Sequence, residues 1–409
     1  MNISYYIAKK IVFNKKPTFS RFIIRLAIAA TAVSVAAMIV TLGMVNGFQH
    51  AVSEKVFGFW GHVRVQNIAP IRNVTAEESP LERNPAIDVL LKENSNIVHY
   101  QTYATKSVVL KTNDNFEGAI LKGIDSSFND EQQKQFLIEG NPIQYPDSAY
   151  SNQILVSKAI ADNLHLKVGD NIHCFFIRDE EDVRMRPVVV SGIYKTGIDE
   201  YDNNFIIGDI RFLRRLNFWQ PNEIGAYEAW LKNPASMDSV AENLYKALPQ
   251  GIAANSIQQI IPGIFDWLAV QDKTKSIVVI IMVIVAAINL ITCLLILVME
   301  RTQMIGVLKA LGLPTTNIKK IFWYYSAYIS LLGIGLGLVF GLGLCFLQQY
   351  TGLVKMDEAT YYLSEAPIYI IWWQVAAVVL GSIAICFLAL RLPLIYINKV
   401  SPVKAIRFK

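Results

Sequence analysis

Residues 26–45 read LAIAATAVSVAAMIVTLGMV and carry no charged side chain. A helix of this length, at about 1.5 Å per residue, is about 30 Å long, which is the thickness of the hydrocarbon core of a bilayer. Three further stretches, residues 277–299, 321–347 and 367–390, are also uncharged and at least as long. All four exceed the roughly 10–14 residues typical of a buried helix in a soluble protein. The sequence therefore predicts four transmembrane helices.

The composition agrees with a chain that is part membrane and part soluble. Hydrophobic residues make up 53% of the chain and charged residues 17%, against about 45–50% and roughly 25% in ordinary soluble domains. The apolar excess is concentrated in the four stretches, and residues 46–275, which are mostly polar, separate the first from the second. We expect one span, a large domain and three further spans, which excludes a purely soluble two-domain protein.

The orientation follows from the basic residues beside the spans, because Lys and Arg accumulate in short cytoplasmic segments. The leader, the loop at 300–320 and the tail together hold 15 basic side chains and one acidic side chain, a net charge of +14. The domain between the first two spans has 22 basic and 29 acidic side chains, a net charge of −7. We therefore place both termini and the 300–320 loop in the cytoplasm and the large domain outside. The basic edges suit an anionic inner leaflet and do not indicate nucleic acid.

The boundaries that we expect follow from these patterns. The leader has apolar residues at helical spacing among lysines, which favours an amphipathic interfacial helix; a frayed basic tail is the alternative. The first apolar run is too long for a cleaved signal peptide, so it is an uncleaved anchor. The predicted segments are an N-terminal helix at 1–22, spans at 23–48, 271–299, 321–347 and 367–390, an outer domain at 49–270, a cytoplasmic loop at 300–320, an outer loop at 348–366 and a basic tail at 391–409.

The outer domain alternates short apolar strands with helices, which predicts an α+β domain, and the two clusters of elements favour two lobes. The expected strands lie at 62–66, 107–111, 117–124, 171–177, 186–193 and 226–231, and the expected helices near 84–92, 157–164, 209–216 and 235–248. Asn84 and Pro85 fit an N-cap followed by proline at the first helical position.

This domain contains few residue patterns that indicate a catalytic or metal-binding site. His165 and His173 lie eight residues apart with Cys174 beside the second, but isolated histidines explain them better than a metal site. The four acids at 179–182 lack the alternation and the glycine of a calcium loop and suit a solvated hairpin tip. No nucleophile-elbow, zincin or P-loop motif occurs. We expect no catalytic residue, no metal and no disulfide framework on this chain.

Two features of the membrane part are more specific. Gly333, Gly337 and Gly341 are four residues apart on the third span, a spacing that lets two helix backbones approach closely; the partner helix could belong to this chain or to another subunit. In the 300–320 loop, Met304, Ile305, Leu308 and Leu311 form one apolar stripe on a short helix that Gly312 would cap and Pro314 would end. We expect these apolar side chains to be buried, either in the membrane surface or against another protein.

Residues 300–312, ERTQMIGVLKALG, resemble the coupling-helix signature of the FtsX-like, MacB-type permeases of ABC transporters. The resemblance covers essentially the whole chain and is greatest to the lipoprotein-releasing subfamily. It also rests on residues 44–48, 61–63, 123–125, 164–170, 192–202 (GIYKTGIDEYD), 287–289 and 401–407 (SPVKAIR).

The resemblance implies a non-catalytic permease in the bacterial inner membrane that pairs with a second, identical or homologous, permease subunit. It also implies two copies of a separate ATPase, which would bind ATP and Mg²⁺, so that this chain holds no cofactor. Closure of the ATPases would move the first two helices and the outer domain, a mechanism called mechanotransmission. The residues that the signature assigns to ATPase coupling are Arg301, Met304, Ile305, Gly306, Leu308, Lys309, Leu311 and Gly312.

The subfamily extracts acylated lipoproteins and passes them to a periplasmic carrier. Burial of one CH₂ yields about 0.8 kcal/mol, so three acyl chains of roughly 15 groups represent about 36 kcal/mol, and the transporter must offer a substitute apolar surface. Candidate lining residues are Val40, Met44, Phe48, Trp267, Ile277 and Ile281, although each could equally face lipid or pack internally. The protruding hairpin that recruits the carrier in this family would fall at 175–187, which is short and acid-tipped here, so the partner subunit could carry that task.

Two alternatives remain open at this point. One is an efflux or cell-envelope-regulating permease of the same superfamily, and the other is a membrane sensor or anchor without transport. The sensor hypothesis leaves the coupling-type loop and the glycine spacing unexplained.

Overall fold

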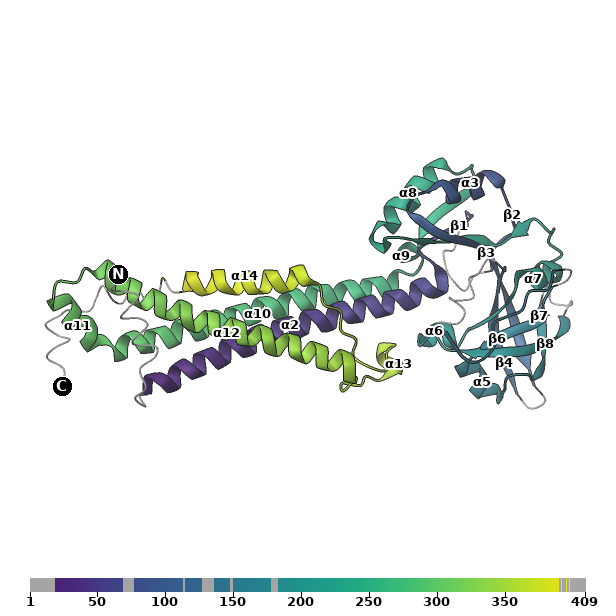
Figure 1. Cartoon of the computed structure of the whole chain (residues 1–409). Helices are drawn as coiled ribbons and strands as arrows, with labels where there is room; N and C mark the ends of the chain where they lie inside the picture. The colour runs from purple at the N-terminus through teal and green to yellow at the C-terminus, as the bar shows by residue number, and fades with distance from the viewer. Residues whose placement is uncertain are drawn as a thin grey trace. The chain divides into compact units, whose positions relative to one another are not determined.

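The computed structural model describes residues 19–68, 77–112, 115–126, 136–147, 150–177 and 183–389, together with residues 391, 395 and 397. The predicted leader before residue 19, most of the predicted tail and the acids at 179–182 lie outside these residues. The chain divides into two compact units (Figure 1). We call them the helical unit (Met1–His50, Leu268–Lys355 and Glu365–Lys409) and the sheet unit (Ala51–Trp267 and Met356–Ser364).

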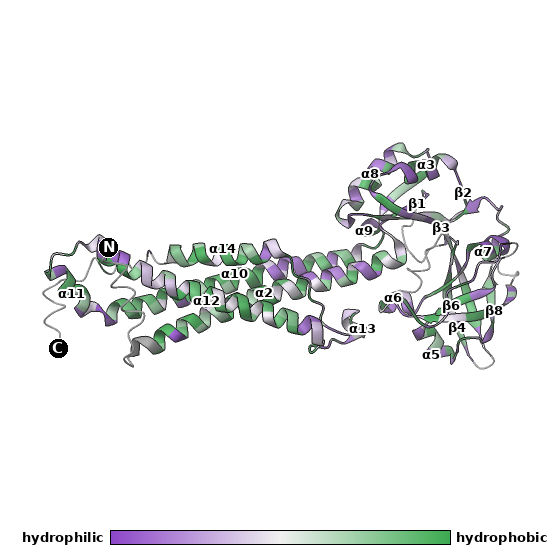
Figure 2. Ribbon diagram, viewed as in Figure 1, coloured by the Kyte–Doolittle hydropathy of each residue, from purple (hydrophilic) through white to green (hydrophobic). Residues whose placement is uncertain are grey.

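Long apolar helices build the helical unit. Within the described residues, α2 (Phe19–Trp60), α10 (Pro262–Glu300) and α12 (Thr315–Thr351) are long and apolar enough to cross a membrane. A fourth apolar helix, α14 (Trp372–Ala389), has 18 residues. Figure 2 shows hydrophobic residues along all four helices. Both α2 and α10 are much longer than the uncharged stretches that predict them, and the sheet unit includes residues 51–60 of α2 and residues 262–267 of α10.

The start of α14 differs from the prediction. Residues 367–371 are not helical, and the helix begins at Trp372. The amide of Tyr369 instead donates a hydrogen bond to the carbonyl of Gly43 on α2, over 3.0 Å. A Cβ atom at Gly47 would lie 2.3 Å from the carbonyl oxygen of Pro367, so this close approach of the strand-like segment to α2 requires glycine. Pro367 cannot donate a backbone hydrogen bond, which suits an extended segment.

Small residues bring α12 and α2 together. A Cβ atom at Gly333 would lie 2.8 Å from Thr31 Cβ, one at Gly337 2.7 Å from the carbonyl oxygen of Ala32, and one at Gly341 3.0 Å from Ala36 Cα. The helix opposite these glycines is therefore α2 of the same chain. Side chains from all four helices also form one apolar cluster: Val35, Met38, Ile39, Leu290, Leu294, Ile334, Cys345, Val375, Val378 and Cys386.

Ten strands of the described residues form the main sheet of the sheet unit. Its order is β12 (Ile252–Ser256), β1 (Val63–Asn67), β11 (Ala226–Leu231), β3 (Ile97–Lys111), β4 (Phe116–Ile124), β9 (Phe205–Asp209), β6 (Gln153–Ser157), β8 (Val183–Tyr194) and β5 (Leu137–Gly140), and β7 (Asn171–Ile177) pairs with β3 and β8. The strand β3 pairs with β11 up to Tyr103 and with β4 from Tyr103 onward. The strand β3 thus links β12, β1 and β11, at one end of the sheet, to β4 and the strands beyond it. A separate pair joins β2 (Leu81–Glu82) and β10 (Glu223–Ile224).

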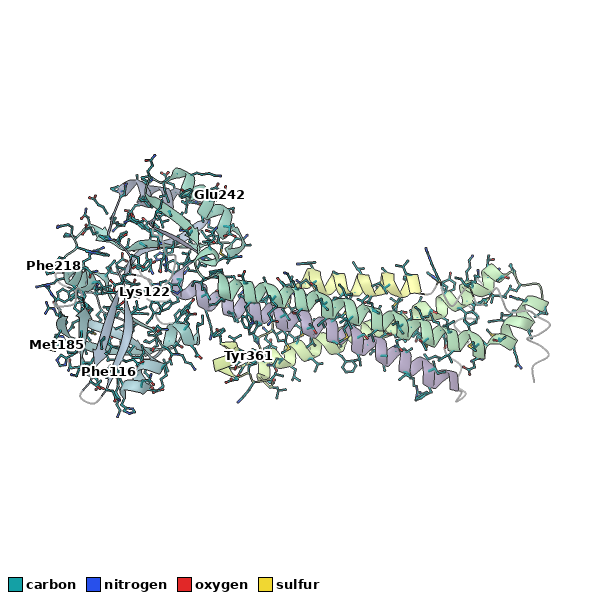
Figure 3. The ribbon with its side chains drawn as sticks, turned by 180° about the vertical axis from the view of Figure 1, so that it is seen from behind. Phe116, Lys122, Met185, Phe218, Glu242 and Tyr361 are labelled. Carbon is teal, nitrogen blue, oxygen red and sulfur yellow. The ribbon has the colours of Figure 1, made fainter. Side chains whose placement is uncertain are left out.

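The sheet unit also contains short helices, several of which begin at a side-chain cap. They are α3 (Pro85–Glu93), α5 (Lys158–Leu164), α6 (Asp199–Asp202), α7 (Ile210–Asn217), η1 (Pro234–Ser236), α8 (Met237–Ala247), α9 (Ile257–Ile260) and α13 (Glu358–Tyr361). The predicted cap at Asn84 is confirmed, because its side chain accepts a hydrogen bond from the amide of Ala86 over 2.9 Å. Figure 3 shows Lys122 inside the unit and Phe116 and Met185 at its surface.

Candidate coupling site in the helical unit

A short helix, α11 (Thr302–Ala310), lies between α10 and α12. Its C-terminus closes with two backbone bonds, from the amide of Gly312 to the carbonyl of Lys309 and from the amide of Leu313 to the carbonyl of Leu308, both over 3.0 Å. Gly312 has a φ of +84°, a conformation that glycine adopts at little cost. Pro314 then caps α12. The predicted stop at Gly312 and Pro314 is confirmed.

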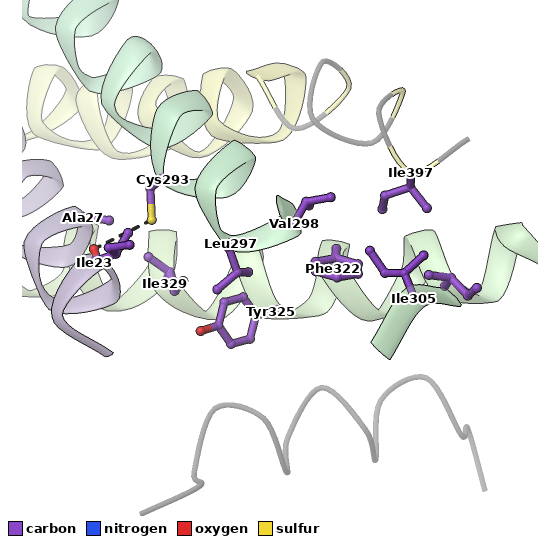
Figure 4. Packing of buried hydrophobic residues seen from close by; sticks show 11 residues of the cluster. Ile23, Ala27, Cys293, Leu297, Val298, Ile305, Phe322, Tyr325, Ile329 and Ile397 are labelled. Carbon is purple, nitrogen blue, oxygen red and sulfur yellow. Dashed lines mark hydrogen bonds between the residues drawn. The ribbon is translucent and has the colours of Figure 1, made fainter. Parts of the chain in front are cut away.

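The apolar stripe of α11 is covered by the chain itself. Ile305 is fully buried among Leu297 and Val298 of α10, Ile318, Phe322 and Tyr325 of α12, and Ile397 (Figure 4). Met304 and Leu308 pack against the same cluster. The expectation that a membrane surface or another protein covers this stripe is therefore wrong for Ile305, because α11 folds back onto the ends of its two neighbouring helices.

A different face of α11 is exposed. Gln303, Val307, Ala310 and Leu311 are solvent-accessible and lie at positions i, i+4, i+7 and i+8, which places them on one side of the helix. Val307 is 48% exposed and Leu311 is 78% exposed. We call these four residues the exposed face of α11. Of the predicted stripe, Leu311 alone belongs to it.

Lys309, a charged residue of the signature, contacts another segment of the chain. The ammonium of Lys309 donates a hydrogen bond to the carbonyl oxygen of Ile397 over 2.8 Å, which ties α11 to the segment after α14. Arg301 is half-buried, and Gly306 is buried. The eight residues assigned to coupling thus divide into a buried group and an exposed end at Leu311 and Gly312. Lys320, in the second turn of α12, is also exposed and adds positive charge to this region.

The structure does not bring the six predicted lining residues together. Phe48 is buried, and Val40 packs against the four-helix cluster. Met44 is half-buried. Trp267 lies in the sheet unit, where its ring meets that of Tyr362 edge-on at 6.1 Å between centroids. Ile277 and Ile281 are on the exposed surface of α10.

That surface of α10 is a continuous apolar face. Six side chains at helical spacing are each about half exposed: Ile277, Ile280, Ile281, Ile284, Val285 and Ile288. We call these residues the isoleucine face. Sequence reasoning selected two of the six, although the i, i+3, i+4, i+7 spacing of the others was available.

A groove lies beside this face, between α2, α10 and α14. It has a volume of about 410 Å³. Its apolar lining includes Met38, Leu42, Val279, Ile280, Val283 and Val378, and its polar end holds Lys275, Ser276 and Gln374. There the ammonium of Lys275 lies 3.1 Å from Asn46 Oδ1, and Asn46 Nδ2 donates to Gln374 Oε1 over 2.6 Å. The sequence did not indicate this groove, because its walls come from three distant helices.

The histidines singled out in the sequence lie on the sheet unit. His165 and His173 line one surface hollow together with Asp170. Cys174 points elsewhere, since it is fully buried, and burial raises the pKa of its thiol to about 12. Among the described residues, no group of three or more His, Cys, Asp or Glu side chains could hold a metal ion.

Apolar helices joined to a large sheet domain define a membrane protein with an extracellular domain. A family model described as MacB-like periplasmic core domain matches residues 26–247, and one described as FtsX-like permease C-terminal matches residues 276–402. The first match alone covers more than half of the chain. The chain therefore belongs to the FtsX-like, MacB-type family of ABC transporter permeases.

Relatives of nearly the same length carry related names. The chain is 23% identical to the lipoprotein-releasing system transmembrane protein LolC of Neisseria meningitidis serogroup B, over 97% of this chain and 96% of that protein. It is 19% identical to the corresponding LolE of Haemophilus influenzae, over 99% of both chains. Among solved structures, the periplasmic region of MacB from Actinobacillus actinomycetemcomitans matches 49% of this chain and 92% of that one, with 12% identity and a TM-score of 0.36.

Proposed function

We propose that the chain is a membrane-spanning permease subunit of an ABC transporter that extracts lipoproteins from the inner membrane for transfer to the outer membrane. The observation that carries this proposal is the exposed face of α11, a largely apolar surface on a loop between two spans, with the exposed Lys320 on the neighbouring helix α12. In the proposal, α14 is a fourth crossing, both termini and α11 are cytoplasmic, and the sheet unit is periplasmic. The 18 residues of α14 are within the range of about 17–25 that a crossing needs.

The exposed face of α11 docks a separate ATPase subunit, of which two copies bind the transporter. A solvent-exposed leucine and valine on one helix face are suited to a helix-in-groove interface, and the basic residues around them complement an acidic groove. ATP and Mg²⁺ bind the ATPase, and this chain supplies no catalytic group. Closure of the ATPases pulls on α10 and α12 through α11, whose buried Ile305 fixes it to both helices. Motion of α10 and α2 then reaches the sheet unit by mechanotransmission.

The isoleucine face and the groove beside it accept the acyl chains of the substrate. Both are apolar along their length, and an acyl chain that leaves lipid for such a surface avoids the cost of about 0.8 kcal/mol per CH₂ that water would impose. The amides and the ammonium at the polar end of the groove suit the ester carbonyls of an acylated N-terminus. The printed names of the relatives, which refer to lipoprotein release, support this substrate class.

The isoleucine face also offers a surface to a second permease subunit, identical or homologous, so that two copies of α10 enclose the substrate. A periplasmic carrier would then receive the lipoprotein. The β7–β8 hairpin of this chain pairs Ile177 with Val183 across its last register position, which leaves a short connection, so the longer carrier-binding hairpin belongs to the partner subunit.

Two experiments test the proposal. The first compares the ATPase activity of the reconstituted complex with an acylated lipoprotein and with its unacylated form. We expect stimulation by the acylated form alone, and equal stimulation by both would exclude lipoprotein extraction while leaving an efflux permease possible.

The second experiment tests the docking surface. The double variant Val307→Asp, Leu311→Asp should lose copurification of the ATPase, because it places two carboxylates on the exposed face. Leu353→Asp is the matched control, since Leu353 is 67% exposed in the same unit and lies outside α11. Normal copurification by the double variant would contradict docking through this face.

A further inference from the structure

The last turn of α2 lies in the sheet unit and has no basic residue of its own. The helix ends at Gly61, whose φ is +68° and whose amide donates to the carbonyl of Phe57 over 2.8 Å. The final carbonyls of a helix have no partner within the helix and carry partial negative charge. A buried helix end therefore needs donors from elsewhere in the fold.

Two side chains of the main sheet supply these donors. The ammonium of Lys122, on β4, donates to the carbonyl oxygen of Phe59 over 2.5 Å. The indole Nε1 of Trp230, on β11, donates to the carbonyl oxygen of Phe57 over 2.8 Å. Two strands that are not neighbours in the sheet thus hold two carbonyls, those of Phe57 and Phe59, at the end of one helix.

Lys122 is held in a fully buried environment. Its ammonium lies 2.7 Å from Glu228 Oε1, and the two side chains are 2% and 0% exposed. Gln101 Nε2 donates to the other carboxylate oxygen of Glu228 over 2.9 Å. The ammonium also lies 4.1 Å from the ring centroid of Trp60 and 5.0 Å from that of Tyr103. Figure 3 shows Lys122 beside the end of α2.

Burying this ion pair in the interior costs free energy. Burial lowers the pKa of Lys122 to about 8, and the nearby Glu228 carboxylate opposes this shift. Replacing a buried ion pair by apolar side chains of similar volume is often neutral or stabilising. Stability alone therefore does not account for the pair. What the ammonium provides beyond stability is a directional, charge-assisted bond between β4 and the helix end.

We propose that Lys122 and Trp230 are positioning residues that attach the end of α2 to strands β4 and β11, so that a displacement of α2 is passed to the sheet. Glu228 holds the Lys122 ammonium charged and oriented. The helix is continuous from Phe19 to Trp60, and the boundary between the two units falls within it, after His50. The inference rests on the proposed function in one respect, which is that nucleotide binding by the partner ATPase moves α2.

The test uses the complete transporter with its ATPase, reconstituted in nanodiscs. Hydrogen exchange of peptides from β4 and β11 is measured with and without ATP and vanadate. In the natural chain we expect the nucleotide to change the exchange rates of both strands. In the double variant Lys122→Met, Glu228→Met, we expect the thermal midpoint to stay within a few degrees of that of the natural chain and ATP hydrolysis to be unchanged. The nucleotide-dependent change in hydrogen exchange should be at least tenfold smaller in both strands.

A matched control and a second variant complete the design. Glu242→Met, Lys246→Met removes an ion pair of the same sheet unit whose side chains are 67% and 66% exposed, and it should behave as the natural chain. If the buried double variant does not fold, Trp230→Phe removes the donor to Phe57 and keeps an aromatic ring, and it should reduce the change in β11.

Full nucleotide-dependent exchange in a folded Lys122→Met, Glu228→Met variant would overturn the attachment, as would full exchange in Trp230→Phe. An absence of any nucleotide effect on the sheet of the natural chain would overturn it as well. None of these measurements needs a lipoprotein. A failure of acylated substrate to stimulate the ATPase would therefore refute the proposed substrate and leave this result unchanged.

Discussion

At the scale of single residues, His62 shows how burial sets chemistry in the sheet unit. Its ring contacts that of Phe57 in a tilted arrangement, with 4.3 Å between centroids, and its Nδ1 accepts a hydrogen bond from the amide of Leu231 over 3.0 Å. An Nδ1 that accepts must be unprotonated. Burial lowers the pKa of His62 from 6.5 to about 4, so the native state keeps the neutral ring.

This shift predicts that the sheet unit loses stability in mild acid. Unfolded His62 binds a proton below pH 6.5, whereas the folded form resists protonation until about pH 4, so stability is present above pH 6.5 and is lost as the pH falls through that window. One pKa unit is about 1.4 kcal/mol, so the loss by pH 4 is about 3 kcal/mol. Pulse proteolysis in urea at pH 7 and pH 4 measures it. His62→Asn should show a smaller loss, and an equal loss in both proteins would refute the assignment to His62.

Asp202 explains part of the stretch GIYKTGIDEYD, residues 192–202. Its carboxylate accepts hydrogen bonds from the amide and the hydroxyl of Thr196, each over 2.8 Å, and from the amide of Gly197 over 2.9 Å. Asp202→Ala leaves these buried donors without their acceptor, which should cost about 3 kcal/mol of unfolding free energy. Glu200→Ala, two residues away and exposed, should stay within about 0.5 kcal/mol. Denaturant midpoints of the sheet unit compare the two, and equal midpoints would show that the loop does not depend on Asp202.

At the scale of elements, the contact between α12 and α2 yields a matched pair of substitutions. A Cβ atom at Gly337 would lie 2.7 Å from both Ala32 O and Val35 Cβ, whereas one at Gly335 would meet nothing within 4 Å. Gly337→Val should therefore separate the two helices and lower the thermal midpoint in detergent by several degrees. Gly335→Val, on the same helix, should leave it nearly unchanged. Equal midpoints for the two variants would contradict close packing at Gly337.

Sequence periodicity predicted strands in which apolar residues are interspersed with polar ones, including β11, all six of whose residues are buried. It found β1, β4, β7, β8 and β11 to within a few residues. It missed β9, all five of whose residues are buried, and β6, which is nearly as buried. Both lie inside the sheet with parallel partners, β4 and β8. Each contains a continuous apolar run, residues 154–156 in β6 and residues 205–207 in β9, and so lacks the alternation on which the prediction depends.

The coupling site was predictable only in part, for a different reason. The helix, its stop at Gly312 and its apolar stripe are local properties of residues 301–314. Which side of α11 becomes covered depends on Ile318, Phe322 and Tyr325 of α12 and on Ile397, and a hydrophobic stripe does not specify its cover. The exposed pair Val307 and Leu311 could have been recognised as a second apolar line, one turn apart on the other side of the helix.

At the scale of the whole molecule, charge and cysteine placement make the topology testable. Basic residues at both ends of the chain and around α11 favour a cytoplasmic location for these segments. The four natural cysteines, Cys174, Cys293, Cys345 and Cys386, are all unpaired and buried. A membrane-impermeant maleimide should therefore give little background on the natural chain, since it needs an accessible thiolate.

Single cysteines introduced before and after the apolar helices then report the side of the membrane. In cells with a permeabilised outer membrane, Glu242→Cys on α8 and Leu353→Cys after α12 should react, because the proposed topology places both outside. Gln303→Cys on α11 and Lys409→Cys should react only after the inner membrane is disrupted. The comparison of Leu353→Cys with Lys409→Cys decides whether α14 crosses the membrane, because the two positions lie on either side of it. Labelling of both Leu353→Cys and Lys409→Cys without disruption of the inner membrane would show that α14 does not cross it. Protection of Glu242→Cys would contradict the orientation derived from the charges.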